Sequence, residues 1–180
     1  MKELSLNILD IAENSVKAGA ALISIVIDET EELLTITITD DGCGMKEEIL
    51  RGVIDPFYTT RTTRKVGLGI PLLKLAAEQT GGCVMITSRH ESEYPDSHGT
   101  IVTAVFCKNH IDCTPMGDVI STITTLIQGS PQIDFEFRHR TMEKTVSLDT
   151  REMRAILGDG IPLSDPEILR WIVQYLQEQY

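Results

Sequence analysis

The sequence predicts an α/β fold, because an amphipathic helix precedes a pair of strands and further helices alternate with further strands. Apolar residues at helical spacing predict a helix over residues 3–18. Isoleucines recur at every second position over residues 23–27, and apolar residues alternate with threonines over residues 34–38, which predicts two strands. The acidic turn between them, residues 29–32, is short enough for an antiparallel hairpin.

A second long helix and two more strands complete the predicted main domain. A short helical stretch and a polar loop over residues 55–66 lead to a helix that ends at the glycine pair 81–82. Pro71 falls in the first turn of this helix, where its missing N–H group costs little. Strands are expected at residues 83–87 and 99–106, joined by a loop.

Residues 108–117 mark a candidate boundary, because a proline and a glycine interrupt this segment. We therefore expect a main domain over residues 1–108 and a small α+β subdomain over residues 109–180. The subdomain is interpreted as a helix at 118–128, a hairpin and closing helices, and a partner-docking role is left open for it. Its expected packing residues are Phe135, Phe137, Trp171 and Leu176, and its expected helix-capping residues are Asp149 and Ser164.

The composition argues against two classes of partner. The formal net charge of -11 repels a phosphate backbone, so no nucleic acid is expected as a partner. No apolar run approaches the roughly 20 residues that span a bilayer, and the N-terminus lacks the apolar core of a signal peptide. We therefore expect a cytoplasmic protein with no membrane segment. The four cysteines show no CxxC spacing and are interpreted as reduced thiols.

The first motif is Asp40-x-Gly42-x-Gly44, directly after the second strand. A carboxylate at a strand end can accept a hydrogen bond from the exocyclic amine of adenine. The glycines let the backbone turn sharply and approach a flat base closely. Taken alone, the same residues also suit an ordinary Asp-Gly turn.

The second motif is Gly67-Leu68-Gly69, which opens a helix after a loop rich in threonine, arginine and lysine. A helix N-terminus offers unpaired N–H groups and a partial positive charge, and both favour phosphate. Taken alone, the segment is better interpreted as a flexible loop with solvated charges.

The third motif is a polar stripe on the first helix, formed by Asp10, Asn14 and Lys17. The amide oxygen of Asn14 suits Mg²⁺, which prefers oxygen ligands. Asp10 could orient or deprotonate a water molecule, and Lys17 could contact phosphate. The alternative is a solvent-facing side of the helix.

The order of these motifs resembles the GHKL superfamily of gyrase, heat-shock chaperones, histidine kinases and MutL. Residues 10–20 are similar to its N box, residues 40–45 to its G1 box and residues 67–70 to its G2 box. Residues 56–61 resemble the F box and Thr-Thr-Lys stretch of histidine kinases, and Gly99-Thr100 matches a later family glycine position. The resemblance covers about residues 4–107.

The resemblance implies a two-layer α/β sandwich, with a mixed sheet covered on one face by helices and ATP held between the layers. Asn14 would ligate Mg²⁺, Asp40 would bind the adenine amine, and residues 57–66 would form a lid over the nucleotide. Asp10 is the candidate catalytic residue. The residues expected to contact the nucleotide are Asn14, Lys17, Asp40, Gly42, Gly44, Thr60, Arg61, Lys65, Gly67, Leu68, Gly69 and Thr100.

Two departures from the family pattern affect the expected chemistry. Hydrolytic members carry glutamate where this chain has Asp10, whose shorter side chain puts efficient hydrolysis in question. Lys65 and Val66 precede the G2 glycines where histidine kinases often have a further glycine. This stiffens the lid and adds positive charge near the phosphates.

Three functions follow from the resemblance. The favoured one is a stand-alone kinase subunit that transfers the γ-phosphate of ATP to a partner protein, which supplies the phosphoacceptor. We expect no phosphoacceptor-bearing helical hairpin before the domain, and we expect the four histidines to be structural or exposed. The alternatives are a slow ATPase switch and a non-catalytic nucleotide sensor. A homodimer is left open.

Overall fold

The computed structural model describes residues 3–54, 68–158 and 160–180. Within these residues, no helix is long and apolar enough to cross a membrane. The elements follow in the order α1 (Leu4–Lys17), β1 (Leu22–Glu29), β2 (Leu33–Asp40), α2 (Glu47–Ile54), α3 (Gly69–Gln79), β3 (Cys83–Arg89), β4 (Gly99–Cys107), α4 (Val119–Gly129), β5 (Asp134–Arg140), β6 (Thr145–Asp149), α5 (Thr150–Leu157) and α6 (Pro166–Gln179).

A single mixed sheet runs through the described chain, with the strand order β3-β4-β2-β1-β5-β6. β1 and β2 form the predicted antiparallel hairpin, with Ile25 opposite Ile38. β1 pairs in parallel with β5, with Ile25 opposite Phe137, while the other neighbouring strands are antiparallel. The predicted α/β fold with a mixed sheet is therefore confirmed.

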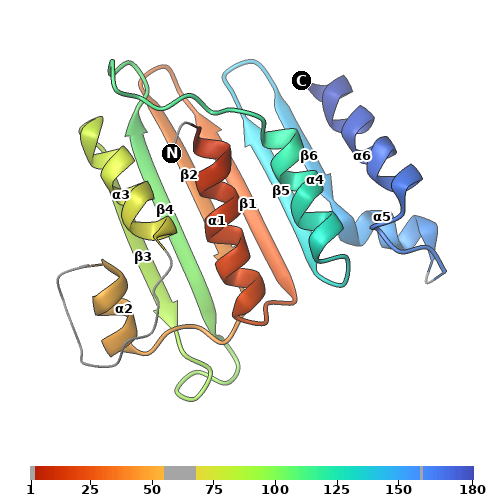
Figure 1. Ribbon diagram of the computed structural model, residues 1–180, viewed down its shortest axis with the longest axis horizontal. Coiled ribbons are helices and arrows are strands. Elements are labelled where there is room, and N and C mark those ends of the chain that lie inside the picture. The colour runs from red at the N-terminus through yellow and green to blue at the C-terminus, as the bar shows by residue number, and fades with distance from the viewer. Residues whose placement is uncertain (1–2, 55–67, 159) are drawn as a thin grey trace.

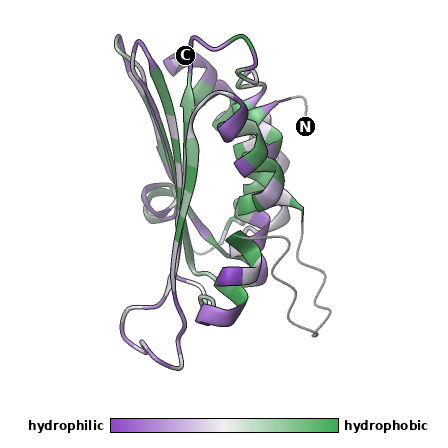
Figure 2. Cartoon of the chain, turned by 90° about the vertical axis from the view of Figure 1, so that its left-hand side faces the viewer, coloured by the Kyte–Doolittle hydropathy of each residue, from purple (hydrophilic) through white to green (hydrophobic). Residues whose placement is uncertain are grey.

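Helices α1, α3, α4 and α6 lie on the same face of the sheet (Figure 1). Figure 2 shows this arrangement edge-on, with hydrophobic residues concentrated between the sheet and these helices. Along β1, β2 and β4, buried side chains alternate with partly exposed ones, as expected when one face of a sheet is covered. The layers share one hydrophobic core, in which Ile8, Ile25 and Ile36 are almost completely buried. The result is the predicted two-layer sandwich.

The C-terminal strands extend the sheet of the preceding residues through the parallel pair β1–β5. Phe135 and Phe137 of β5 and Leu176 of α6 are buried in the common core, as expected. Trp171 differs from the expectation, because it is 49% exposed and stacks on Tyr175 with ring centroids 4.9 Å apart. The tryptophan lies one turn before Tyr175 on the outer side of α6, so its ring packs on its own helix.

Most predicted helix ends agree with the structure. Gly81 follows α3 with a φ of +81°, the left-handed conformation typical of a residue after a helix. The Asp149 carboxylate caps α5 by accepting a hydrogen bond from the Arg151 N–H. The predicted cap at Ser164 is wrong by one residue, because Asp165 caps α6 and Pro166 begins it. Proline suits the first helical position, so the cap lies directly before it.

The end of α6 is tied to the sheet by a buried histidine. His139 of β5 contacts the Tyr180 hydroxyl through Nδ1 at 2.7 Å and Glu29 Oε1 through Nε2 at 2.9 Å. Burial, together with the negative charge of Glu29, raises the pKa of Tyr180 to about 12. Burial also tends to raise the pKa of Glu29, but hydrogen bonds from Lys108 and His139 outweigh it and lower that pKa. These contacts join the chain's last residue to β1 and β5.

Candidate functional site

A buried carboxylate lies where the end of β2 meets α1. Asp40 is the last residue of β2 and is only 9% exposed. Its Oδ2 accepts a hydrogen bond from the Ser15 hydroxyl at 2.6 Å, and its Oδ1 accepts one from the Gly42 N–H at 2.9 Å. A carboxylate offers about four acceptor positions, so acceptor capacity remains for a further donor, such as an amine.

The turn that follows Asp40 is held by hydrogen bonds from several elements. The Cys43 N–H donates to the carbonyl of Ala18 at 2.9 Å, at the end of α1. The Met45 N–H donates to the Ser88 hydroxyl at 2.7 Å, on β3. The backbone of this turn is therefore fixed in place between α1 and the sheet.

The glycines of the turn are required by close approaches of the backbone. Gly44 has a φ of +69°, and a Cβ at this position would lie 1.9 Å from the carbonyl oxygen of Arg89. A Cβ on Gly42 would lie 2.8 Å from the Cβ of Ala18 and 3.0 Å from Asp40 Oδ1. Side chains at either position would therefore displace the groups around the carboxylate.

Thr100 lies beside Asp40 in the sheet. The two residues are direct partners in the antiparallel pair β2–β4, and Thr100 is 9% exposed. The Thr100 hydroxyl is 2.9 Å from the hydroxyl of Ser88. The Ser88 hydroxyl also accepts a hydrogen bond from the Met45 N–H. The structure thus brings Asp40, Gly42, Gly44 and Thr100 into one connected cluster.

The beginning of α3 faces α1 beside Asp10. A Cβ on Gly69 would lie 3.1 Å from the Cβ of Asp10 and 3.8 Å from its Oδ2. The two helices lie side by side (Figure 1). Leu68 precedes α3 without a side-chain cap, so it does not occupy the first N–H groups of that helix. The Asp10 carboxylate therefore lies next to the end of a helix that favours anions.

The other two predicted residues of α1 are more exposed. Asn14 is partly buried and, within the described ranges, its side chain makes no hydrogen bond. Lys17 is exposed and forms an ion pair with Glu13 at 3.9 Å. Lys17 and Glu13 also line a hollow of about 240 Å³ between α1 and α4.

Asn7 is a buried polar residue on the same stripe of α1, two turns before Asn14. It is 2% exposed, and its amide nitrogen finds no hydrogen-bond partner among the described residues. A buried donor without a partner costs about 1–3 kcal/mol. Among the described residues, the polar stripe of α1 thus contains one buried, unsatisfied donor.

Four predicted contact residues lie outside the described residues: Thr60, Arg61, Lys65 and Gly67. The predicted lid, residues 57–66, lies there too. Their roles stay predictions.

Three residues of the cluster were not singled out by their sequence context. Ser15 and Ser88 each hydrogen-bond a predicted site residue, and His98 places its Nδ1 2.6 Å from the carbonyl oxygen of Gly42. Ser15 directly follows Asn14 and points to the sheet rather than to α3, a position that helical geometry alone could have indicated. Ser88 and His98 come from β3 and its following loop, so only the strand pairing brings them here.

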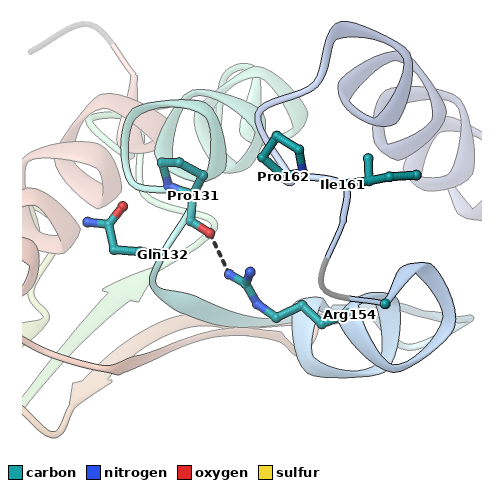
Figure 3. A pocket seen from close by; sticks show the side chains of 6 residues that line it. Pro131, Gln132, Arg154, Ile161 and Pro162 are labelled. Carbon is teal, nitrogen blue, oxygen red and sulfur yellow. Dashed lines mark hydrogen bonds between the residues drawn. The ribbon is translucent and has the colours of Figure 1, made fainter.

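A separate hollow of about 370 Å³ lies near the C-terminal helices (Figure 3). Among the described residues that line it, Arg154 carries the charge; it donates to Asp134 Oδ1 at 2.7 Å and to the carbonyl oxygens of Pro131 and Ile133 at 2.5 and 3.1 Å. These hydrogen bonds engage the Arg154 guanidinium within the protein, and they fix the start of β5 to α5. The residues that the sequence proposes for binding and catalysis lie elsewhere, around Asp40 and Asp10.

A helix, a strand end and a glycine turn that share one buried carboxylate, on a two-layer α/β sandwich, define a domain of the GHKL type. The family model described as "Histidine kinase-, DNA gyrase B-, and HSP90-like ATPase" matches residues 2–110. The chain belongs to this family.

Curated relatives are similar over the same part of the chain. The tetrathionate sensor histidine kinase TtrS of Salmonella typhimurium is 32% identical over 93 residues, which are 52% of this chain and 15% of the relative. Sporulation kinase A of Bacillus subtilis is 29% identical over 91 residues, which are 51% of this chain and 15% of the relative. The chain therefore spans only a small part of the length of these kinases.

Solved structures share the fold over more of the chain. The MutL ATPase domain of Aquifex aeolicus, complexed with ADP, superposes with a TM-score of 0.56 at 13% identity, over 99% of this chain and 70% of that one. The N-terminal domain of a DNA repair protein superposes with a TM-score of 0.59 at 17% identity, over 89% of this chain and 58% of that one. The fold similarity thus includes the C-terminal strands and helices.

Proposed function

We propose that this chain binds Mg-ATP and transfers its γ-phosphate to a separate partner protein. The observation that carries the proposal is the buried Asp40 carboxylate, held by Ser15 and Gly42 with acceptor capacity to spare. Adenine offers an exocyclic amine that fits such an acceptor, and Gly42 and Gly44 let the turn pack closely enough against Ala18 and Arg89 to hold the carboxylate in place. Thr100 would support the same site from the sheet, since it pairs directly with Asp40 across β2 and β4.

The phosphates would lie between α1 and the start of α3. Asn14 would hold Mg²⁺ through its amide oxygen, since this ion prefers oxygen ligands and is shared with phosphates. Mg²⁺ would neutralise phosphate charge when bound. The residues fit this arrangement. Within the described residues the Asn14 amide makes no hydrogen bond, and Asn14 lies one turn from Asp10, whose side chain packs beside Gly69 at the start of α3.

Lys17 would contact the phosphates as a point charge. It must first leave its ion pair with Glu13, and an exposed pair of this kind contributes only about 0–1 kcal/mol. The charge of a bound triphosphate is larger than that of one carboxylate. We therefore infer that the lysine exchanges partners when the nucleotide binds.

Transfer requires a nucleophile that the partner supplies. The partner's side chain would attack the γ-phosphorus, the bond to the bridging oxygen would break, and ADP would leave. Such a reaction depends on positioning and charge neutralisation more than on covalent chemistry by the kinase. The role of this chain would be to hold the nucleotide in one orientation. We place this reaction in the cytoplasm, where both ATP and the partner protein would be present.

The test is a transfer assay with the whole chain. Mg-ATP labelled at the γ-phosphate is mixed with the protein and a native cell extract, and labelled proteins are separated on a gel. We expect a second protein to become labelled with the wild type and with Asp41→Asn, but not with Asp40→Asn. Asp41 is a matched control, since its carboxylate binds the backbone N–H groups of Ala21 and Leu22 instead. No labelled protein in any lane would contradict transfer.

A slow ATPase switch is the second candidate function, and the position of Asp10 favours it. Its carboxylate lies beside Gly69 at the start of α3, where an attacking water would need a base. Free phosphate released by the purified wild type, and lost in Asp10→Asn, would support this function. Tight binding with neither labelled protein nor free phosphate would support a nucleotide sensor.

A further inference from the structure

The loop between β3 and β4 touches the glycine turn at both of its ends. The Glu91 N–H, at the start of the loop, donates to the carbonyl of Cys43 at 2.9 Å. His98, at its end, lies 2.6 Å through Nδ1 from the carbonyl oxygen of Gly42. Between these points the loop is exposed and folds on itself, with the Tyr94 N–H donating to the carbonyl of His90.

The chemistry of the His98 contact fixes the proton on one ring nitrogen. A backbone carbonyl oxygen only accepts hydrogen bonds, so Nδ1 of His98 must be the donor. A bond of 2.6 Å is short for a nitrogen donor, which indicates close seating of the ring against the turn.

Packing around the next residue holds His98 in this position. Gly99 has a φ of +132°, and a Cβ there would lie 2.0 Å from the carbonyl oxygen of Asp40. The following residue, Thr100, pairs with Asp40 in the sheet. Residues 98–100 therefore pack directly against the backbone of residues 40–42.

The contact bears on the Asp40 carboxylate through one peptide unit. The Gly42 N–H donates to Asp40 Oδ1, while the Gly42 carbonyl accepts from His98. If that carbonyl were released, the peptide units on both sides of Gly42 could rotate more freely, because glycine is conformationally permissive. The N–H that orients the carboxylate would then be held less firmly.

We propose that His98 is a positioning residue for purine recognition, which clamps the Gly42 carbonyl and so preorganises the Asp40 carboxylate. This inference rests on the proposed adenine pocket. His98 lies outside the N box and the glycine motifs. The proposal also gives the exposed β3–β4 loop a role, which is to support the glycine turn after Asp40. Preorganisation of this kind increases affinity by reducing the ordering required on binding.

The test measures the affinity of the whole chain for ATP, ADP and adenosine by calorimetry. Loss of one hydrogen bond should weaken binding by about three- to tenfold for His98→Ala. The factor should be the same for all three ligands, because the clamp acts on the purine end. His98→Asn keeps a donor close to the position of Nδ1 and should bind within about twofold of the wild type.

The matched control is His110→Ala, since His110 is exposed in a loop that makes no contact with the turn. Unchanged affinity in His98→Ala would overturn the inference, and so would failure of His98→Asn to restore binding in a protein with wild-type melting temperature. If the wild type itself bound no nucleotide, the proposed function would fail first. The two failures are therefore distinguishable.

Discussion

The purine end and the phosphate end of the candidate site are built differently. Around Asp40, side-chain and backbone groups are tied to neighbours on α1, β3 and the β3–β4 loop. Around Asp10 and Asn14, the side chains make no hydrogen bond within the described part of the chain, and Lys17 has one loose ion pair. The contrast suggests that the fold preorganises recognition of the base, while the groups at the phosphates gain their partners on binding.

The largest effect is expected for Gly44→Ala. The added Cβ would combine a left-handed φ with a clash against the Arg89 carbonyl, and together these should cost about 3 kcal/mol of unfolding free energy. Gly19→Ala is the matched control, because Gly19 has a φ of +74° but open space around it. It should cost only about 1 kcal/mol. Equal losses in urea unfolding would show that the turn is not tightly packed.

Asp40→Asn should produce the next largest effect, on binding. One carboxylate oxygen becomes an amide donor, so a charged acceptor for the base is lost, and affinity should fall by about 100-fold. ATP and ADP should be affected alike, because both carry adenine. Asp41→Asn should bind as the wild type does. A loss confined to ATP in calorimetric titrations would place Asp40 at the wrong end of the nucleotide.

Asn14→Ala should affect the proposed phosphate end of the site and leave the purine end unchanged. Loss of one metal ligand should weaken ATP binding in the presence of Mg²⁺ by about tenfold, and binding without Mg²⁺ should change little. Glu13→Ala is the control and should not weaken binding, because Glu13 points about 100° away from Asn14 on α1 and its loss only frees Lys17 from an ion pair. Titrations with and without the metal ion give the comparison. The same affinity with Mg²⁺ in variant and wild type would argue against the N-box role of Asn14.

The smallest effect, and one of opposite sign, is expected for Asn7→Leu. Leucine has nearly the shape of asparagine, and it removes the buried amide nitrogen that lacks a partner in the described residues. The ligand-free protein should gain about 1 kcal/mol of stability in urea unfolding. A destabilised variant would show that the amide has a partner and that the α1–α3 interface is as fully paired as the purine end.

Local sequence patterns predicted the elements of both ends, because their signals are local. The spacing of Asp40, Gly42 and Gly44 lies within one turn, and the stripe of Asp10 and Asn14 lies on one helix. Period-two alternation located β1 and β2, and the short turn between them indicated their antiparallel pairing. Such patterns depend only on neighbours in the chain.

Contacts between distant segments could not be predicted in this way. The parallel pairing of β5 with β1 joins residues more than a hundred positions apart, and no residue pattern in β5 specifies its partner strand. His98 was interpreted as structural or exposed, since nothing around it indicates a bond to Gly42. Its role becomes visible only when β3 and β4 align next to β2.

The central claim is that a carboxylate fixed between α1 and β2 recognises adenine nucleotides. Calorimetric titration of the whole purified chain with ADP and, separately, with GDP tests it most directly. We expect saturable heat for ADP and at least about tenfold weaker binding of GDP, whose ring presents a carbonyl oxygen where adenine presents its amine. The absence of heat from ADP at millimolar concentration, or equal affinity for the two nucleotides, would contradict the account.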